Sequence, residues 1–250
     1  MFSKSAQYYD ILYSTFKDYN EECANIQSLL TELFPQARTV LDVGCGSGEH
    51  ARILNEEFGY AVDGIDIEPE FVRISQQKCP HGKFYAKNMA DFDVDCKYDV
   101  VLCLFSSIAY VKTRENVIKT LLCFNKHISA NGVILVEPWF TPDKWQKDRV
   151  SILTSSNDKI SVCRMSHNTI AGRISRMNFH YLIGQESGID HFEEIHELGL
   201  FTHEEMLECF NKANLVVNFR PQGFSVKGLY IARKKSITWS STNNIIRNHF

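Results

Sequence analysis

The chain has 250 residues, enough for one large domain or one domain with an insertion. A net charge of -3, with no basic run except residues 233–235, argues against a nucleic-acid-binding surface. No apolar stretch approaches the roughly 20 residues of a membrane span, and no apolar signal segment begins the chain. Eight scattered cysteines without a CxxC pair predict reduced thiols in a cytoplasmic protein and no metal site.

Helix and strand patterns alternate through the first half of the chain. Residues 2–34 predict helix with a polar break at Lys17 and Asp18. Apolar runs bounded by turn residues predict strands at residues 39–43, 61–67, 83–86, 98–104 and 133–136. Helical periodicity predicts helices at residues 50–57, 70–78 and 116–127. This alternation indicates βαβ units and a mostly parallel sheet.

The pattern changes after Trp139. Turn residues separate three extended runs, which predict an antiparallel meander at residues 159–167, 173–183 and 190–201. Thr202 and Glu205 then have the spacing of a capping box, which predicts a helix over residues 202–213. A closing hairpin is predicted from residues 216–219 and 228–232.

These elements predict an α/β, Rossmann-like fold with a mostly parallel seven-stranded sheet and an inserted antiparallel β meander. We expect residues 1–137 and 201–235 to form a cofactor-binding core. Residues 138–200 would form the insertion and the acceptor pocket, and residues 236–250 a flexible tail.

The most informative stretch is TVLDVGCGSGEHAR, residues 39–52. Its glycines, which include Gly44 and Gly46, are spaced G-x-G-x-G, whereas the dinucleotide fingerprint G-x-G-x-x-G would need glycine in place of Glu49. A carboxylate there and the nearby Asp42 would repel a pyrophosphate. S-adenosylmethionine (SAM) carries no phosphate, and its positive charges suit an acidic loop.

Two further loops extend the predicted cofactor site. Asp66 ends the second strand, where its carboxylate can accept hydrogen bonds from a ribose diol. Ile67 could cover one face of an adenine, while Asn88 and Met89, after the third strand, could hold the other face and the exocyclic amine. An aspartate at a strand end is often only a turn former, so the prediction depends on the combination.

The motifs resemble those of class I SAM-dependent methyltransferases, whose first and second motifs look like LDVGCGSG and GIDI. More specifically, the chain is similar to the sugar N,N-dimethyltransferases that act on nucleotide-linked 3-amino-deoxysugars in antibiotic pathways. That likeness rests on FSSI (105–108), VEPW (136–139), R-x-S-H (164–167), HYL (180–182), H-x-E-E-x-H (191–196) and LFT (200–202). It implies methyl transfer to the amine of a small acceptor, a nucleotide-linked amino sugar, by in-line displacement with little general-base catalysis.

The resemblance also implies roles for individual residues. The N-terminal segment of such enzymes closes over the cofactor, which makes Tyr9 a catalytic and Tyr19 a cofactor-binding candidate, with Tyr110 the second catalytic candidate. Leu104 and Phe105 would lie beside the cofactor. The candidates for acceptor binding are Glu137, Trp139, Arg164, Ser166, His167, His180 and Lys227.

Three positions depart from the family pattern: Asn88 replaces an aspartate, Tyr110 a histidine and Lys227 an arginine.

Several candidates also have simpler interpretations. The N-terminal tyrosines could merely pack a lid, Glu137 could hold a backbone turn, and a histidine in a sheet is more often structural. Strand alternation puts His191, Glu193 and Ile195 on one side, and Glu194 and His196 on the other.

Alternative functions remain open at this point. The chain could methylate the nitrogen or oxygen of another small molecule, or bind SAM or a nucleotide without catalysis. A dehydrogenase is disfavoured by the glycine spacing, and a nucleic-acid methyltransferase by the net charge and the lack of an NPPY-type motif. The sequence is compatible with a homodimer but does not indicate which residues would form its interface.

Overall fold

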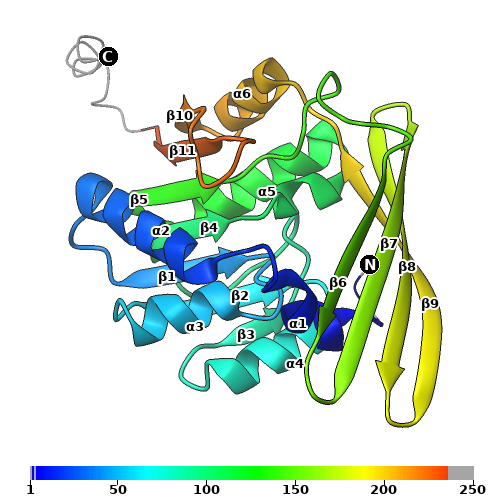
Figure 1. Ribbon diagram of the computed structural model, residues 1–250. Coiled ribbons are helices and arrows are strands. Elements are labelled where there is room, and N and C mark those ends of the chain that lie inside the picture. The colour runs from blue at the N-terminus through cyan, green and yellow to red at the C-terminus, as the bar shows by residue number, and fades with distance from the viewer. Residues whose placement is uncertain (1, 3, 236–250) are drawn as a thin grey trace.

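The computed structural model describes residue 2 and residues 4–235. Within this part, a seven-stranded sheet A has the order β10-β11-β5-β4-β1-β2-β3, and a four-stranded sheet B has the order β6-β7-β8-β9 (Figure 1). The predicted α/β fold with a mostly parallel sheet and an antiparallel insertion is therefore confirmed. The predicted flexible tail, residues 236–250, lies outside the described residues.

Sheet A contains β1 (Thr39–Val43), β2 (Ala61–Asp66), β3 (Phe84–Ala86), β4 (Tyr98–Cys103), β5 (Ile128–Val136), β10 (Leu215–Arg220) and β11 (Leu229–Lys234). The pairs β1–β2, β1–β4, β2–β3 and β4–β5 are parallel. The closing hairpin is antiparallel and joins the sheet through β5.

Helices cover both faces of sheet A. They are η1 (Ala6–Tyr8), α1 (Tyr9–Tyr13), α2 (Tyr19–Leu33), α3 (Glu49–Glu56), α4 (Pro69–Lys78), η2 (Ser107–Val111), α5 (Arg114–His127) and α6 (His203–Lys212). The apolar residues of α2 and α3 pack on one face, and those of α5 and α6 on the other. The strands are consequently apolar on both sides, as expected for parallel strands between two helical layers.

Predicted helix boundaries agree closely with the structure. The Asp18 side chain accepts the backbone N–H of Glu21 and begins α2, so the polar break is a helix cap. Thr202 and Glu205 form the predicted capping box of α6. One strand boundary was wrong: β5 starts at Ile128, because Gly132 lies in a shift of the β4–β5 register rather than in a turn before the strand.

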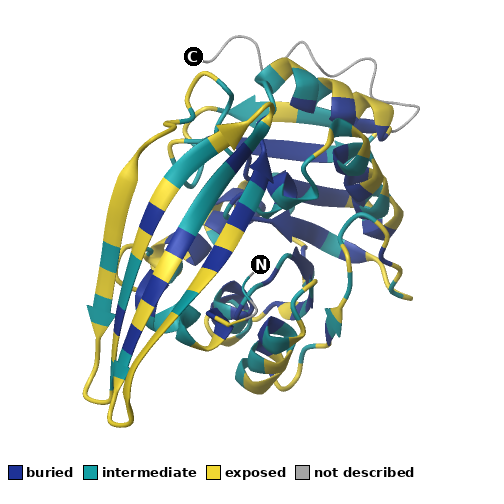
Figure 2. Cartoon of the chain, turned by 90° about the vertical axis from the view of Figure 1, so that its right-hand side faces the viewer, coloured by how far each residue is buried: buried dark blue, intermediate teal, exposed yellow. Residues whose placement is uncertain are grey.

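Sheet B has one strand more than the three runs predicted. Its strands are β6 (Val150–Ser156), β7 (Ile160–Ala171), β8 (Ile174–Gln185) and β9 (Gly188–Gly199). β6 escaped prediction because it is an edge strand whose side chains are mostly exposed, so it lacks a clear alternation (Figure 2). The other three strands alternate between an inner face toward sheet A and an outer face.

The inner face of sheet B packs against the N-terminal segment. Leu12 and Tyr13 of α1 form a third apolar cluster with Val162, Phe179, Tyr181 and Ile183 of sheet B. The start of the chain therefore lies between the two sheets, where Figure 1 shows α1 beside β6 and β7. Among the described residues, no helix combines the length and apolar character needed to cross a membrane.

Candidate active site

A cavity of about 510 Å³ lies between sheet A, the N-terminal segment and the inner face of sheet B. Its floor is the carboxyl ends of β1, β2 and β4, next to the point where the chain order reverses between β1 and β4. Ligands of open parallel sheets bind at this kind of switch point. Its walls include residues predicted for both ligands, namely Tyr9, Gly44, Gly46, Asp66, Ile67, Asn88, Met89, Phe105, Tyr110, Trp139, Arg164 and Lys227.

The glycine loop between β1 and α3 leaves space beside its backbone that a side chain at these positions would occupy. Gly44 and Gly46 have φ angles of +74° and +55°, in the left-handed region that favours glycine. A Cβ at Gly44 would meet the Cβ of Ser107 at 2.7 Å, whereas one at Gly46 would meet nothing within 4 Å. The loop can therefore bring its backbone against a ligand in the cavity.

The second loop places Asp66 beside the first. One oxygen of Asp66 accepts the backbone N–H of Gly46 and the other that of Glu68, both at 2.9 Å. Burial raises the pKa of this carboxyl, which lines the cavity next to the half-exposed Ile67. After the neighbouring strand β3, the Asn88 side-chain oxygen accepts the N–H of Ala90, and Asn88 also lines the cavity.

Asp42 lies beneath the glycine loop and has an unsatisfied oxygen. The residue is 2% exposed, and its Oδ2 has no hydrogen-bond partner among the described residues. Burial raises the pKa of the carboxyl to about 6. Asp42 lines a small cavity beside the main one, together with Tyr19 and Leu104. A buried carboxylate without a partner is unfavourable unless a cation or donor completes it.

A strained turn follows β4 at the junction of the two cavities. Phe105 and Ser106 have φ angles of +50° and +65°, which are uncommon for residues other than glycine. Glu137 holds this turn, since its carboxylate accepts the Phe105 N–H at 2.7 Å and pairs with Lys227 at 3.1 Å. Glu137 is buried and does not line the cavity, and its hydrogen bond to Phe105 is that of a backbone support.

The N-terminal helix closes one side of the cavity with aromatic rings. Tyr9 stacks on Tyr13 with ring centroids 4.1 Å apart, and burial raises the pKa of the Tyr9 phenol. The Tyr13 hydroxyl accepts a 2.8 Å hydrogen bond from Arg164 of β7. The Arg164 Nε is buried and has no partner among the described residues. This arginine thus joins the lid to sheet B and retains an unused donor.

Tyr110 is held by two buried residues of β9. Its hydroxyl lies 2.8 Å from Nδ1 of His196, whose Nε2 lies 3.5 Å from Glu194. Glu194 in turn accepts hydrogen bonds from the backbone N–H groups of Lys4 and Ser5. Burial alone would raise the pKa of Glu194, but its hydrogen bonds hold the pKa below the ordinary value. Burial lowers the pKa of His196, which favours a neutral imidazole.

Besides Glu137, three further predicted acceptor residues do not reach the cavity. Ser166 is buried and hydrogen-bonded to Ser151 of β6. His167 and His180 lie on the outer face of sheet B, because strand alternation points them away from the face that carries Arg164 and Phe179. The prediction that these three residues line the acceptor was therefore wrong. Trp139 does line the cavity and donates its indole N–H to Ser175.

Other lining residues were not predicted. They include Phe2, Tyr13, Lys112, Met177, Phe179 and Leu198. Tyr13 follows Tyr9 by one helical turn, so the i,i+4 spacing of the two tyrosines was an available signal. A signal for the position of His196 was also present in the sequence. The alternation of β9 places His196 and Glu194 on one face of the strand and His191 and Glu193 on the other.

Comparison with known proteins identifies the family. A model described as a methyltransferase domain matches residues 40–129. The dTDP-3-amino-3,6-dideoxy-alpha-D-glucopyranose N,N-dimethyltransferase of Streptomyces fradiae is 34% identical over 227 residues, which cover 90% of this chain and 89% of the relative. The chain belongs to the sugar N,N-dimethyltransferase family. It is a SAM-dependent methyltransferase of a small-molecule acceptor.

Superposition on solved structures supports the same family. DesVI of Streptomyces venezuelae superposes with a TM-score of 0.87 at 30% identity, covering 92% of this chain and 98% of that chain. SAM-bound CalS10, an amino pentose methyltransferase from Micromonospora echinaspora, superposes with a TM-score of 0.81 at 27% identity, covering 90% and 96%.

The residues of the cavity fit SAM as the cofactor. The space at Gly46 admits a ligand that a side chain would exclude. The unpaired oxygen of Asp42 suits a positively charged group, and the backbone-held carboxylate of Asp66 suits a diol. The chemistry of these side chains is thus consistent with SAM, the predicted cofactor.

Proposed function

We propose that the enzyme transfers methyl groups from SAM to the amine of a nucleotide-linked amino sugar. The observation that carries this proposal is the cavity itself, which joins a SAM-type loop to a wall of cationic and aromatic side chains from sheet B and the loops of sheet A. The names of the relatives support a dTDP-linked 3-amino sugar in particular.

The two ends of the site would bind different ligands, the cofactor at one end and the acceptor at the other. Next to β1 and β2, Gly46 and Asp66 of the main cavity and Asp42 of the adjoining small cavity would hold the cofactor. When bound, SAM supplies a methyl group already activated on a positively charged sulfonium. At the other end, Arg164, Lys112 and Lys227 offer positive charge to a diphosphate, while Trp139 and Phe179 offer aromatic faces to the sugar and base.

Arg164 is the best-placed cation for the acceptor. It extends from the inner face of β7 over the Phe179 ring, with its guanidinium carbon 4.2 Å from the ring centroid. Its Nη1 is used by Tyr13, but its Nε has no partner in the described chain. An unpaired buried N–H is unfavourable, so a phosphate oxygen that accepted from it would bind strongly.

Tyr110 and His196 provide a route for the proton that the amine must lose. A His196 tautomer protonated on Nε2 points that proton toward Glu194, and Nδ1 then accepts from the Tyr110 hydroxyl. The phenol oxygen keeps lone pairs for an N–H of the amine. Transfer of that proton to Tyr110 as the phenol proton moves to Nδ1 would leave an imidazolium beside the Glu194 carboxylate.

A thermal-shift experiment tests the acceptor class. S-adenosylhomocysteine and thymidine diphosphate should each raise the melting temperature, because each binds the folded state. Arg164→Gln should reduce the shift from thymidine diphosphate and retain that from S-adenosylhomocysteine. Arg176→Gln is the matched control, since Arg176 pairs with Glu197 and does not line the cavity. An absent thymidine diphosphate shift in the wild type would contradict the nucleotide-sugar acceptor.

We also propose a cytoplasmic homodimer. All eight cysteines are unpaired, which suits a reducing compartment. Exposed apolar side chains on the edge strand β6, Val150 and Ile152, support association of two copies through this edge of sheet B. Light scattering of the purified protein tests the dimer, and a monomer would contradict it. Fractionation of the source cells tests the compartment, and recovery of the protein in the membrane fraction would contradict a cytoplasmic location.

A further inference from the structure

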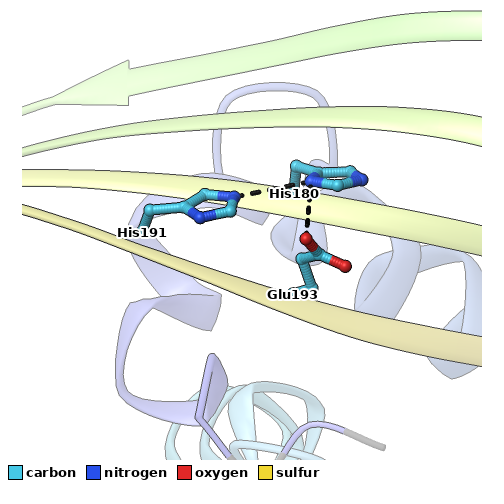
Figure 3. A group of neighbouring side chains, drawn as sticks. All are labelled: His180, His191 and Glu193. Atoms are coloured by element: carbon cyan, nitrogen blue, oxygen red, sulfur yellow. Dashed lines mark hydrogen bonds and ion pairs between the residues drawn. The ribbon is translucent and has the colours of Figure 1, made fainter.

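Three metal-ligating side chains meet on the outer face of sheet B, away from the cavity (Figure 3). They are His180 of β8 and His191 and Glu193 of β9. In the β8–β9 register His180 lies directly opposite Glu193, and His191 is diagonal to it. Residue spacing along the chain predicts no metal site, whereas this cluster forms by pairing across two strands.

Two of the three distances between donor atoms in the cluster match those around a tetrahedral metal ion. Nδ1 of His180 lies 3.4 Å from Nε2 of His191 and 3.5 Å from Oε1 of Glu193. Ligand atoms bound at about 2.0–2.2 Å in a tetrahedron are separated by about 3.4 Å. All three atoms lie within 4.8 Å of one another, so a small rotation of one side chain would complete the geometry.

The chemistry of the three donors is selective. Two imidazoles and one carboxylate form a nitrogen-rich site that suits zinc and related transition metal ions better than calcium or magnesium, which prefer oxygen ligands. All three side chains are exposed, so an ion can enter directly from solvent. Exposed Leu182 and Ile195 share this face with the cluster and would limit the number of competing waters.

We propose that His180, His191 and Glu193 form a surface site for one divalent transition metal ion of the zinc type, with the fourth coordination position open to water. The ion would join β8 to β9. The inner faces of these strands carry Phe179 and Leu198, which line the cavity. Metal binding would therefore stabilise the wall that the sheet contributes to the acceptor site, without touching the reacting groups.

Titration of Zn²⁺ into the full chain, freed of any affinity tag and stripped with a chelator, tests the site. We expect one Zn²⁺ per chain, with a Kd raised at least about tenfold by His191→Ala and by Glu193→Gln. His167→Ala is the matched control, because His167 is exposed on the same face but lies outside the cluster, and it should leave the Kd unchanged.

Two further readouts separate this site from binding elsewhere. Zn²⁺ should raise the melting temperature of the wild type and of His167→Ala, but not of His180→Ala. Co²⁺ bound in place of Zn²⁺ should show the intense visible absorption of a tetrahedral complex, and His191→Ala should abolish it. The proposal is overturned if the wild type shows no saturable Zn²⁺ binding, or if binding persists unchanged in both His180→Ala and His191→Ala.

Discussion

The hydroxyl of Tyr110 and Nδ1 of His196 are 2.8 Å apart, so a tyrosine at the cavity wall and a fully buried histidine share one hydrogen bond. The phenol comes from η2 of the core and the imidazole from β9 of the insertion. This contact therefore couples the cofactor-binding core to the acceptor wall. It also fixes the direction in which the Tyr110 oxygen can accept a hydrogen bond.

Removal of the Tyr110 hydroxyl should slow turnover. We expect Tyr110→Phe to lower kcat by about tenfold or more, with a smaller effect on the affinity for SAM, because in the proposed mechanism the phenol would position the amine and accept its proton. Tyr60→Phe is the matched control, since the Tyr60 hydroxyl bonds to Gln27 outside the main cavity. Equal kcat values for the wild type and Tyr110→Phe would remove this tyrosine from the mechanism.

His196 should set the acidic limb of the pH profile. Burial lowers the pKa of His196, so the imidazole is neutral and accepts from Tyr110 except at acid pH. Protonation would block Nδ1, and kcat should then fall as the pH is lowered. His196→Asn should reduce kcat and flatten this limb. A variant with low kcat but an unchanged pH profile would indicate that His196 is structural only.

Asp42 should make both stability and SAM binding depend on pH. Its folded pKa is raised from 3.8 to about 6, mainly by burial. The ligand-free protein should therefore lose stability as the pH rises through this interval, by up to about 3 kcal/mol. Positive charge on SAM favours the ionised carboxylate, so SAM affinity should rise from about pH 5 to about pH 7.

Asp42→Asn provides the control for both effects. The amide does not ionise, so its melting temperature and SAM affinity should vary less with pH than those of the wild type. Calorimetric titration of SAM into both proteins measures the difference. Parallel pH dependences in the wild type and the variant would show that another group is responsible.

Asp66 should control affinity for the cofactor. Asp66→Asn keeps the shape of the side chain but replaces one acceptor oxygen by a donor, and we expect the Kd for SAM to rise by about tenfold. Asp63→Asn on the same strand is the control, because Asp63 accepts the Lys83 N–H and the Tyr98 hydroxyl away from the cavity. Similar Kd values for the two variants would contradict the assignment of Asp66 to the ribose.

The cofactor half of the site could be predicted because its determinants are local. The loop with Gly44 and Gly46 directly follows β1, and Asp66 ends β2, so the order of strands alone brings them together. The conformation of Phe105 and the support from Glu137 were less accessible, since they depend on a contact between the ends of β4 and β5.

The acceptor half was harder to predict because it depends on the faces of a separate sheet. His167 and Arg164 belong to one short motif, but their positions differ by three along a strand, an odd number, so they point to opposite faces. His196, the hydrogen-bond partner of Tyr110, lies 86 residues away in sequence, and only the packing of β9 against η2 brings the two together. The His180 cluster forms by pairing of β8 with β9.

Methyl transfer to a defined acceptor tests the central claim most directly. The purified enzyme would be incubated with SAM and dTDP-3-amino-3,6-dideoxyglucose, and the product mass measured against a control with dTDP-glucose, which lacks the amine. We expect a mass increase of one and then two methyl groups, only with the amino sugar and SAM together. Binding of SAM without methylation of this or any other nucleotide-linked amino sugar would contradict it.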